Sequence, residues 1–179
     1  NVLRRNEPVA TDSIFSPYGI PAVDNGATCA QFFCGLYTYF CDVYGMSRPK
    51  EFPSILLENI RKRGAMDKLV SDMGTNELSN IVFQILRFLH IDDAQSEPYM
   101  HHQNPAERRL RWVKETFNYL MNWTDAPPET WLLALQYILF IINRMAFKPL
   151  NWKTPFEALK GYTPDISMIY RFRFWDKVI

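Results

Sequence analysis

A nearly uncharged aromatic segment limits the folds that this 179-residue chain can adopt. Residues 31–45 read QFFCGLYTYFCDVYG, and Asp42 is the single charged residue among them. Aromatic side chains favour strands, and a run with so little polar alternation indicates strands that are buried on one or both faces. We therefore expect two strands in the middle of a sheet here.

Two further strands are predicted from shorter signals. Residues 9–15 form a β-prone stretch closed by Ser16-Pro17, and Asp24-Asn25-Gly26 is a strong turn signal behind it. Residues 68–71 form another short β-prone stretch, which ends at Asp72. A sheet of at least four strands is expected.

Helical spacing of apolar residues dominates the rest of the chain. It predicts helices at about residues 53–63, 76–89, 104–123, 129–145 and 154–161, with a polar loop before the third of them. Pro127-Pro128 separates the two longest helices. Strands that come mainly first and helices that follow predict an α/β fold.

Composition narrows the possible partners. A content of 47% hydrophobic residues is sufficient for one core, and the net charge of +1 means that any contact with nucleic acid must come from local basic clusters. The most apolar run, residues 131–142, is shorter than the roughly 20 residues that span a bilayer, so no membrane partner is expected. The chain starts without Met or a leader-like segment, and we expect it to be excised from a longer protein.

The cysteines and histidines predict neither a disulfide framework nor a zinc site. The three cysteines, Cys29, Cys34 and Cys41, contain no Cys-x-x-Cys pair. The histidines supply no spacing that would complete a zinc site with them. We expect reduced, buried thiols.

Three acidic residues on three predicted elements are the candidate catalytic groups: Asp12, Asp72 and Glu107. Phosphodiester chemistry with two divalent ions requires several carboxylates that converge on one point. Each residue also has an ordinary explanation. Asp12 could be a solvated strand end, Asp72 a turn residue, and Glu107 the reciprocal glutamate of a helix capping box.

The helix that follows Glu107 is amphipathic in a way that suits a nucleic-acid site. Its polar stripe consists of Glu107, Arg111, Lys114 and Asn118, and its buried stripe of Leu110, Val113, Phe117, Leu120 and Met121. Arg108 and Arg109 raise the local basic density. Cations beside a carboxylate can contact a DNA backbone, although an ordinary solvated face would show the same pattern.

These motifs together resemble the retroviral integrase superfamily, particularly the integrase core of copia-type LTR retrotransposons. The matching segments are SDMGTNE around Asp72, HHQNPAERR around Glu107, the pair Asn143-Arg144, and TPFEALKG with Thr163-Pro164 downstream. The resemblance covers most of the chain. It implies one catalytic core over residues 1–179 of a polyprotein fragment, with a C-terminal extension at about residues 147–179.

The resemblance implies a ribonuclease-H-like α/β fold with a mixed central sheet flanked by helices. It also implies an integrase that processes element DNA ends and joins them to target DNA, with two Mg²⁺ or Mn²⁺ ions bound by Asp12, Asp72 and Glu107. The residues implied to bind DNA are Asn104, Arg108, Arg111 and Lys114. A homo-oligomer is expected, in an intracellular location that becomes nuclear within an integration complex.

The sequence departs from the family motifs at two positions, and it leaves open both the identity of the first acidic residue and two rival functions. Met73 replaces the Asn that usually follows the second Asp, and Pro105 replaces the Gly that usually follows the loop Asn. Asp42 is an alternative to Asp12 as the first acidic residue. The rival functions are a ribonuclease-H-type nuclease and a decayed or recruited integrase-like domain that binds DNA or protein without metal chemistry.

Overall fold

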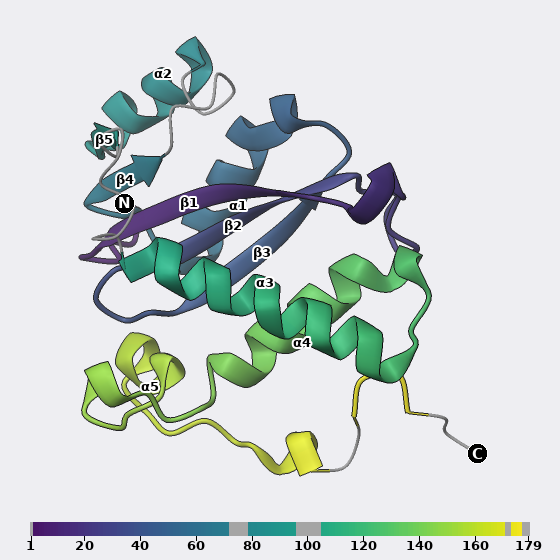
Figure 1. The fold of residues 1–179 in the computed structure, drawn as a ribbon. Helices are drawn as coiled ribbons and strands as arrows, with labels where there is room; N and C mark the ends of the chain where they lie inside the picture. Colours follow the sequence, from purple (N-terminus) through teal and green to yellow (C-terminus); the bar gives the residue numbers. More distant parts are fainter. Residues whose placement is uncertain (1, 72–78, 96–104, 171–172, 177–179) are drawn as a thin grey trace.

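A mixed five-stranded sheet forms the centre of the computed structural model, which describes residues 2–71, 79–95, 105–170 and 173–176 (Figure 1). The strand order is β3-β2-β1-β4-β5. The strands are β1 (Pro8–Phe15), β2 (Cys29–Gly35), β3 (Cys41–Met46), β4 (Lys68–Ser71) and β5 (Asp92–Gln95). β1, β2 and β3 pair antiparallel, whereas β4 pairs parallel with both β1 and β5.

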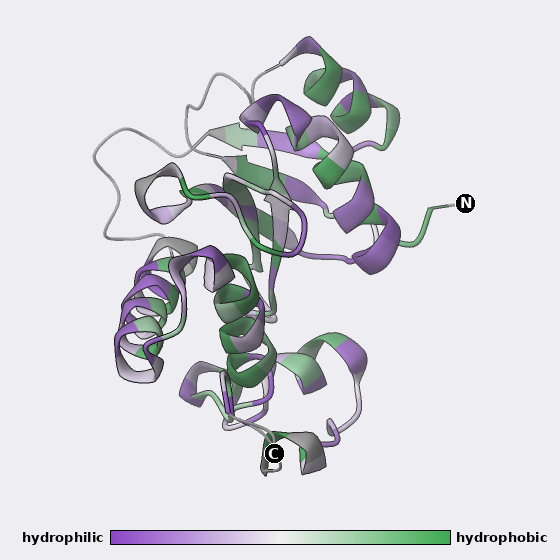
Figure 2. Cartoon of the chain, turned by 90° about the vertical axis from the view of Figure 1, so that its right-hand side faces the viewer, coloured by the Kyte–Doolittle hydropathy of each residue, from purple (hydrophilic) through white to green (hydrophobic). Residues whose placement is uncertain are grey.

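Helices cover both faces of this sheet (Figure 2). They are α1 (Phe52–Arg63), α2 (Asn80–Phe88), α3 (Pro105–Thr124), α4 (Trp131–Ile142) and α5 (Pro155–Lys160). The helices α3 and α4 pack against each other and on one face, and α1 and α2 lie on the other. Because successive strand residues point to opposite faces, Ala10 and Ile14 of β1 face α3 and α4, while Val9 faces α1 and α2.

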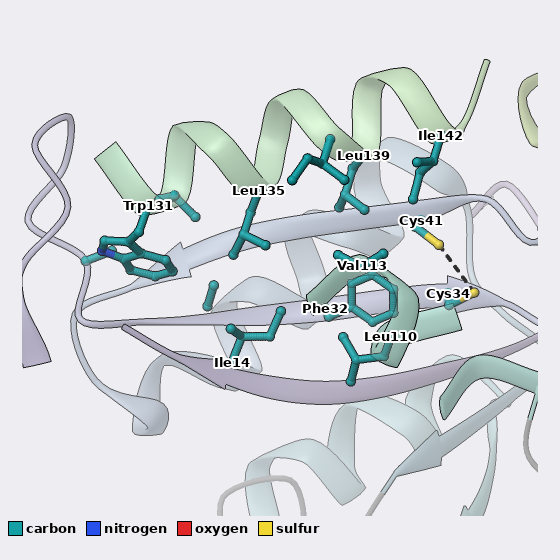
Figure 3. Packing of buried hydrophobic residues seen from close by; sticks show 14 of the residues in the cluster. Ile14, Phe32, Cys34, Cys41, Leu110, Val113, Trp131, Leu135, Leu139 and Ile142 are labelled. Atoms are coloured by element: carbon teal, nitrogen blue, oxygen red, sulfur yellow. Dashed lines mark hydrogen bonds between the residues drawn. The ribbon is translucent and has the colours of Figure 1, made fainter. Parts of the chain in front are cut away.

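The larger core lies between the sheet and the pair α3 and α4 (Figure 3). Phe32 of β2 lies in the same cluster as Leu110 and Val113 of α3, and α4 directs a row of buried side chains towards the strands. That row consists of Trp131, Leu135, Leu139 and Ile142. Since a fully buried large apolar side chain contributes roughly 1.5–3 kcal/mol, these contacts hold α3 firmly over β1 and β2.

Cys29, Cys34 and Cys41 are free and buried, as expected. The Cys41 thiol donates to Cys34 Sγ at 3.4 Å. This hydrogen bond, together with burial, raises the pKa of Cys34 well above its usual value. The Cys34 thiol therefore acts as a neutral member of the core at physiological pH.

The buried side chain of Asn143 ties the end of α4 to β3. Its amide nitrogen donates to Cys41 O at 2.7 Å, and its carbonyl oxygen accepts from Cys41 N–H at 2.9 Å. β3 lies at the edge of the sheet, so this side chain satisfies backbone groups that no neighbouring strand pairs with. The Asn143-Arg144 motif thus has a structural role.

Most of the predicted elements are confirmed, with changes at their ends. Four predicted strands are present, although β3 is an edge strand and not a central one. β5 was wrongly predicted to be part of a polar loop, because its residues DDAQ lack the usual strand composition. The two helices α2 and α4 are shorter than predicted in the described residues. None of the helices in that part of the chain is long and apolar enough to cross a membrane.

Candidate active site

Asp12 lies in β1 on the face that α3 covers. Its neighbours two residues away on the strand, Ala10 and Ile14, are both part of the core beneath α3 and α4. Asp12 Oδ1 accepts a hydrogen bond from the Ser13 backbone N–H at 2.7 Å, and Oδ2 lies 3.8 Å from Lys114 Nζ of α3. The side chains of Asp12 and Lys114 are 44% and 47% exposed, so this pair is open to solvent.

The second predicted acidic residue, Asp72, lies outside the described residues. Ser71, which precedes it, is buried at the end of β4. β4 is the direct neighbour of β1, and the last paired residues of the two strands are Ala10 and Val70. Asp12 follows Ala10 in the sequence by the same two positions as Asp72 follows Val70.

The third predicted acidic residue, Glu107, belongs to the first turn of α3 by its backbone, but its side chain lies outside the described part of the chain. α3 starts at Pro105, which agrees with the predicted helix start. The buried stripe of α3 is confirmed, because Leu110 and Val113 are buried and Phe117 and Leu120 pack against the same core. Glu107 and Lys114 are therefore carried by one helix whose apolar side faces β1 and β2.

The predicted DNA-binding residues differ in their surroundings. Arg108, Arg111 and Lys114 are exposed on α3, whereas Asn104 lies outside the described residues. Arg109, which was expected to raise the local basic density together with Arg108, is buried, with 7% of the residue exposed. Its guanidinium carbon lies 4.5 Å from the ring centre of Phe147 and 5.0 Å from that of Trp112.

Asp42, the alternative first acidic residue, lies in different surroundings from Asp12. It is paired in register with Phe33, whose side chain belongs to the core beneath α1 and α2. Both of its oxygens accept hydrogen bonds from Arg63 of α1, at 2.7 and 2.9 Å. This ion pair gives Asp42 a structural partner on the face of the sheet opposite to α3.

Asp12 is the one member of the predicted metal-binding set whose side chain is described. Within the described residues, no three His, Cys, Asp or Glu side chains gather closely enough to hold a metal ion. Asp72 and the Glu107 side chain do not belong to those residues, so the predicted set stays a prediction. The carboxylate of Asp12 is an oxygen donor of the kind that Mg²⁺ and Mn²⁺ prefer, and its exposure leaves it accessible.

Comparison with solved structures identifies the fold. Residues of this chain align with the HTLV-2 integrase catalytic core domain in complex with magnesium, in its dimeric form, with a TM-score of 0.63 and 17% identity, over 90% of this chain and 100% of the other. The BIV integrase catalytic core domain aligns with a TM-score of 0.66 and 16% identity, over 87% and 95% of the two chains. This chain has the fold of a retroviral integrase catalytic core. The predicted ribonuclease-H-like architecture is thereby confirmed.

The integrase-core fold also occurs in a chain of the simian T-cell lymphotropic virus intasome, with a TM-score of 0.66 and 16% identity, over 93% of this chain and 57% of the other. No protein family model matches the sequence. Among curated proteins, the retrovirus-related Pol polyprotein from transposon 412 of Drosophila melanogaster is 26% identical over 152 residues. That alignment covers 82% of this chain, which spans only 12% of the length of the polyprotein.

The comparisons agree with the resemblance to an integrase core that the sequence motifs indicated. The narrower assignment to copia-type elements stays a prediction. The sequence placed Asp12 and Lys114 correctly on a strand and a helix, but their closeness depends on how α3 lies over β1, which no local pattern encodes.

Proposed function

We propose that this chain is the catalytic core of a retrotransposon integrase, which processes element DNA ends and joins them to target DNA. The observation that carries the proposal is the position of Asp12, on the central strand of an integrase-core fold and 3.8 Å from a lysine of α3. α3 is the helix that also contains Glu107. A carboxylate beside a cation on a neighbouring element is an arrangement suited to phosphodiester chemistry.

Asp12, Asp72 and Glu107 are the residues that would hold two Mg²⁺ or Mn²⁺ ions. All three provide carboxylate oxygens, and the described one, Asp12, is half-exposed on the face towards α3. When bound, such ions activate an attacking oxygen and stabilise a leaving oxygen of the DNA. In support, the HTLV-2 core was solved in complex with magnesium in both dimeric and trimeric forms.

In this proposal the basic residues of α3 bind DNA phosphates and do not bind the metal ions. Lys114, Arg111 and Arg108 are exposed on α3, and Lys114 lies beside Asp12. Their charges would bind and orient the phosphates of an element DNA end, with Asn104 in the segment before α3. The long Lys114 side chain is half-exposed, so it can exchange Asp12 for a phosphate without disturbing the core.

The proposal extends to assembly and location. The HTLV-2 cores are described as dimeric and trimeric, and the simian virus protein as part of an intasome, which supports a homo-oligomer acting on DNA. We assign the chain to an intracellular, copia-type element, and to the nucleus when it is part of an integration complex. The alternatives are a ribonuclease-H-type nuclease on the same fold and a decayed core in which Met73 accompanies lost activity.

A comparison of substrates separates these functions. The chain would be incubated with Mn²⁺ and either a labelled branched DNA, which mimics the product of strand transfer, or a labelled RNA–DNA hybrid. We expect the branched DNA to be resolved and the hybrid to remain intact. Cleavage of the hybrid alone would assign a ribonuclease, and inactivity on both would assign a decayed core.

The triad is tested with Asp12→Asn, Asp72→Asn and Glu107→Gln in the same assay. Each substitution keeps the size of the side chain and removes its charge, so each is expected to abolish resolution of the branched DNA while leaving thermal unfolding nearly unchanged. Full activity in any of the three variants would remove that residue from the proposed set. The matched control is Glu115→Gln, an exposed carboxylate on α3, which is expected to stay active.

A further inference from the structure

A cavity of about 500 Å³ lies between the N-terminal half of α3 and the segment that follows α4. Residues from three parts of the chain line it: Tyr39 of the β2–β3 turn, Arg108, Arg109 and Trp112 of α3, and Ile142, Met145, Ala146, Phe147 and Pro149 at and after the end of α4. This volume is within the range of sites that bind small organic ligands. None of the predicted catalytic residues lines the cavity in the described part of the chain.

The walls of the cavity are largely apolar and aromatic. The rings of Tyr39 and Phe147 meet edge to face, with centroids 5.0 Å apart. Trp112 supplies a further ring, and Met145 adds a flexible thioether side chain. Surfaces of this kind bind flat apolar groups, because rings stack on them and a thioether adapts to their shape.

Arg109 is the unusual member of the lining. The residue is 93% buried, because its exposed fraction is 7%, and its Nε atom has no hydrogen-bond partner. Nη2 donates one long bond, of 3.4 Å, to Ile142 O. The guanidinium lies over the rings of Trp112 and Phe147, which stabilise its charge but do not replace a hydrogen-bond acceptor for Nε.

Among the described residues, no carboxylate compensates the charge of Arg109. The lining includes a second cation, Arg108, and no Asp or Glu among the described residues. None of the ion pairs found in the described part of the chain involves Arg109. A buried cation without a counterion is costly, and truncated or unpaired ionic sites destabilise proteins by several kcal/mol. An anion in the cavity would offset this cost.

The shape and charge together define the anion. A carboxylate matches the planar donor groups of one guanidinium and carries a single negative charge. A phosphate carries more charge and binds more water than one buried cation compensates. The apolar walls require that the rest of the ligand be flat and uncharged.

We propose that this cavity is a binding site for a small aryl carboxylate, with its carboxylate on the Arg109 guanidinium and its ring against the aromatic wall formed by Trp112, Phe147 and Tyr39. The site is separate from Asp12 and does not depend on the proposed integrase activity. Arg108 at the rim attracts the anion, and Arg109 fixes its orientation.

Binding is tested with 2-naphthoate as the probe, against the uncharged 2-naphthamide of nearly equal shape. Each is titrated into the ¹⁵N-labelled chain, and the indole N–H signal of Trp112 is followed, after its assignment as the signal that Trp112→Phe removes. We expect saturable shifts with naphthoate at a Kd below about 1 mM and binding of the amide weaker by about 10-fold or more. Equal affinities for the two compounds, or no saturable shift, would overturn the proposal.

Two variants and one control localise the site. Arg109→Met keeps the length of the side chain and is expected to weaken naphthoate binding by about 10-fold or more, with little effect on the amide. Ala146→Trp fills the cavity from an exposed position and is expected to abolish binding of both compounds while the protein stays folded. The control is Arg144→Met, because Arg144 also has a buried Nε and lies over an aromatic ring, that of Phe140, but does not line this cavity.

The proposal can still be tested if one of these variants does not fold. Naphthoate affinity that is unchanged in folded Ala146→Trp would overturn the proposed location, whatever the behaviour of Arg109→Met. Tighter binding of thymidine monophosphate than of naphthoate at the same Trp112 signal would assign the cavity to a nucleotide and overturn the carboxylate assignment. Loss of naphthoate binding in Arg144→Met would equally contradict it.

Discussion

Lys114 Nζ lies 3.8 Å from Asp12 Oδ2, which joins the middle of α3 to the central strand β1. Both side chains are about half-exposed, so the pair contributes little to stability. The Lys114–Asp12 pair is informative because it shows where α3 lies relative to β1. The contact shows that α3 presents a cation at the carboxylate for which the sequence motifs predict a catalytic role.

Replacement of Lys114 by Met is expected to weaken binding of an element-end DNA duplex and to leave stability nearly unchanged. A plot of the logarithm of DNA affinity against the logarithm of salt concentration has a negative slope. Loss of one phosphate contact reduces the magnitude of that slope by about 1. The measurement is fluorescence anisotropy of labelled DNA at several salt concentrations, with chemical unfolding of the same variant. Lys160→Met, at the end of α5, is the control. An unchanged salt dependence in Lys114→Met would exclude Lys114 from the DNA contact.

Replacement of Glu7 by Gln is expected to destabilise the protein by about 3 kcal/mol. Glu7 is 1% exposed, and its carboxylate accepts hydrogen bonds from Arg5 Nε, from the backbone N–H groups of Tyr37 and Thr38, and from the Thr38 hydroxyl. The amide would leave the buried Arg5 without its counterion.

Urea unfolding measures the Glu7 effect. Glu58→Gln is the matched control, because Glu58 forms an exposed pair with Lys62 on α1 and should cost less than about 1 kcal/mol. Similar losses of unfolding free energy in the two variants would contradict the account of the buried pair.

Replacement of Asn143 by Ala is expected to lower the unfolding free energy by about 2–4 kcal/mol, since it leaves the N–H and C=O groups of Cys41 unsatisfied. Amide exchange at Cys41 should accelerate more than exchange at Phe32 in the interior strand β2. Asn122→Ala, at an exposed position of α3, should leave both measurements unchanged. Unaltered exchange at Cys41 in Asn143→Ala would speak against the proposed anchor.

Tyr44 should make stability depend on pH in the alkaline range. Burial, and to a lesser extent the Asp42 carboxylate, raise the pKa of Tyr44 from 10.0 to about 12. The folded protein therefore holds the phenolic proton more tightly than the unfolded chain does. This contribution is complete below pH 10 and is lost as the pH rises from 10 through about 12.

The pH dependence is measured by comparing unfolding free energies between pH 9 and 12 in the parent and in Tyr44→Phe. The decline should be shallower in Tyr44→Phe, whereas Tyr119→Phe should decline like the parent, since Tyr119 is 68% exposed. Parallel curves for the parent and Tyr44→Phe would show that the pKa of Tyr44 is not raised.

Local patterns predicted the elements that have strong periodicity or clear caps. The stripe of Leu110 and Val113 predicted the buried side of α3, and Thr154-Pro155 predicted the start of α5, where Thr154 and Glu157 form a capping box. The strand β5 was missed because its pairing with β4 comes from the parallel sheet and not from its own composition.

Contacts between segments that are distant in the sequence explain the remaining differences between the predictions and the structure. Arg109 occurs among charged neighbours in the sequence, yet Trp112 and Phe147 cover it, and Phe147 becomes its neighbour only when α4 packs on α3. Asp42 and Asp12 are both strand residues, and only the register of β2 with β1 and β3 separates their faces. Periodicity cannot report either relationship.

The most direct test of the proposed site compares Asp12→Asn with Asp42→Asn in Mn²⁺-dependent resolution of a branched DNA. The first variant should fold as stably as the parent and lose activity, because Asp12 faces α3 and its exposed ion pair contributes little to stability. The second should unfold more easily, because it weakens both hydrogen bonds from Arg63, and should keep activity while folded. An active Asp12→Asn together with a folded, inactive Asp42→Asn would contradict the account.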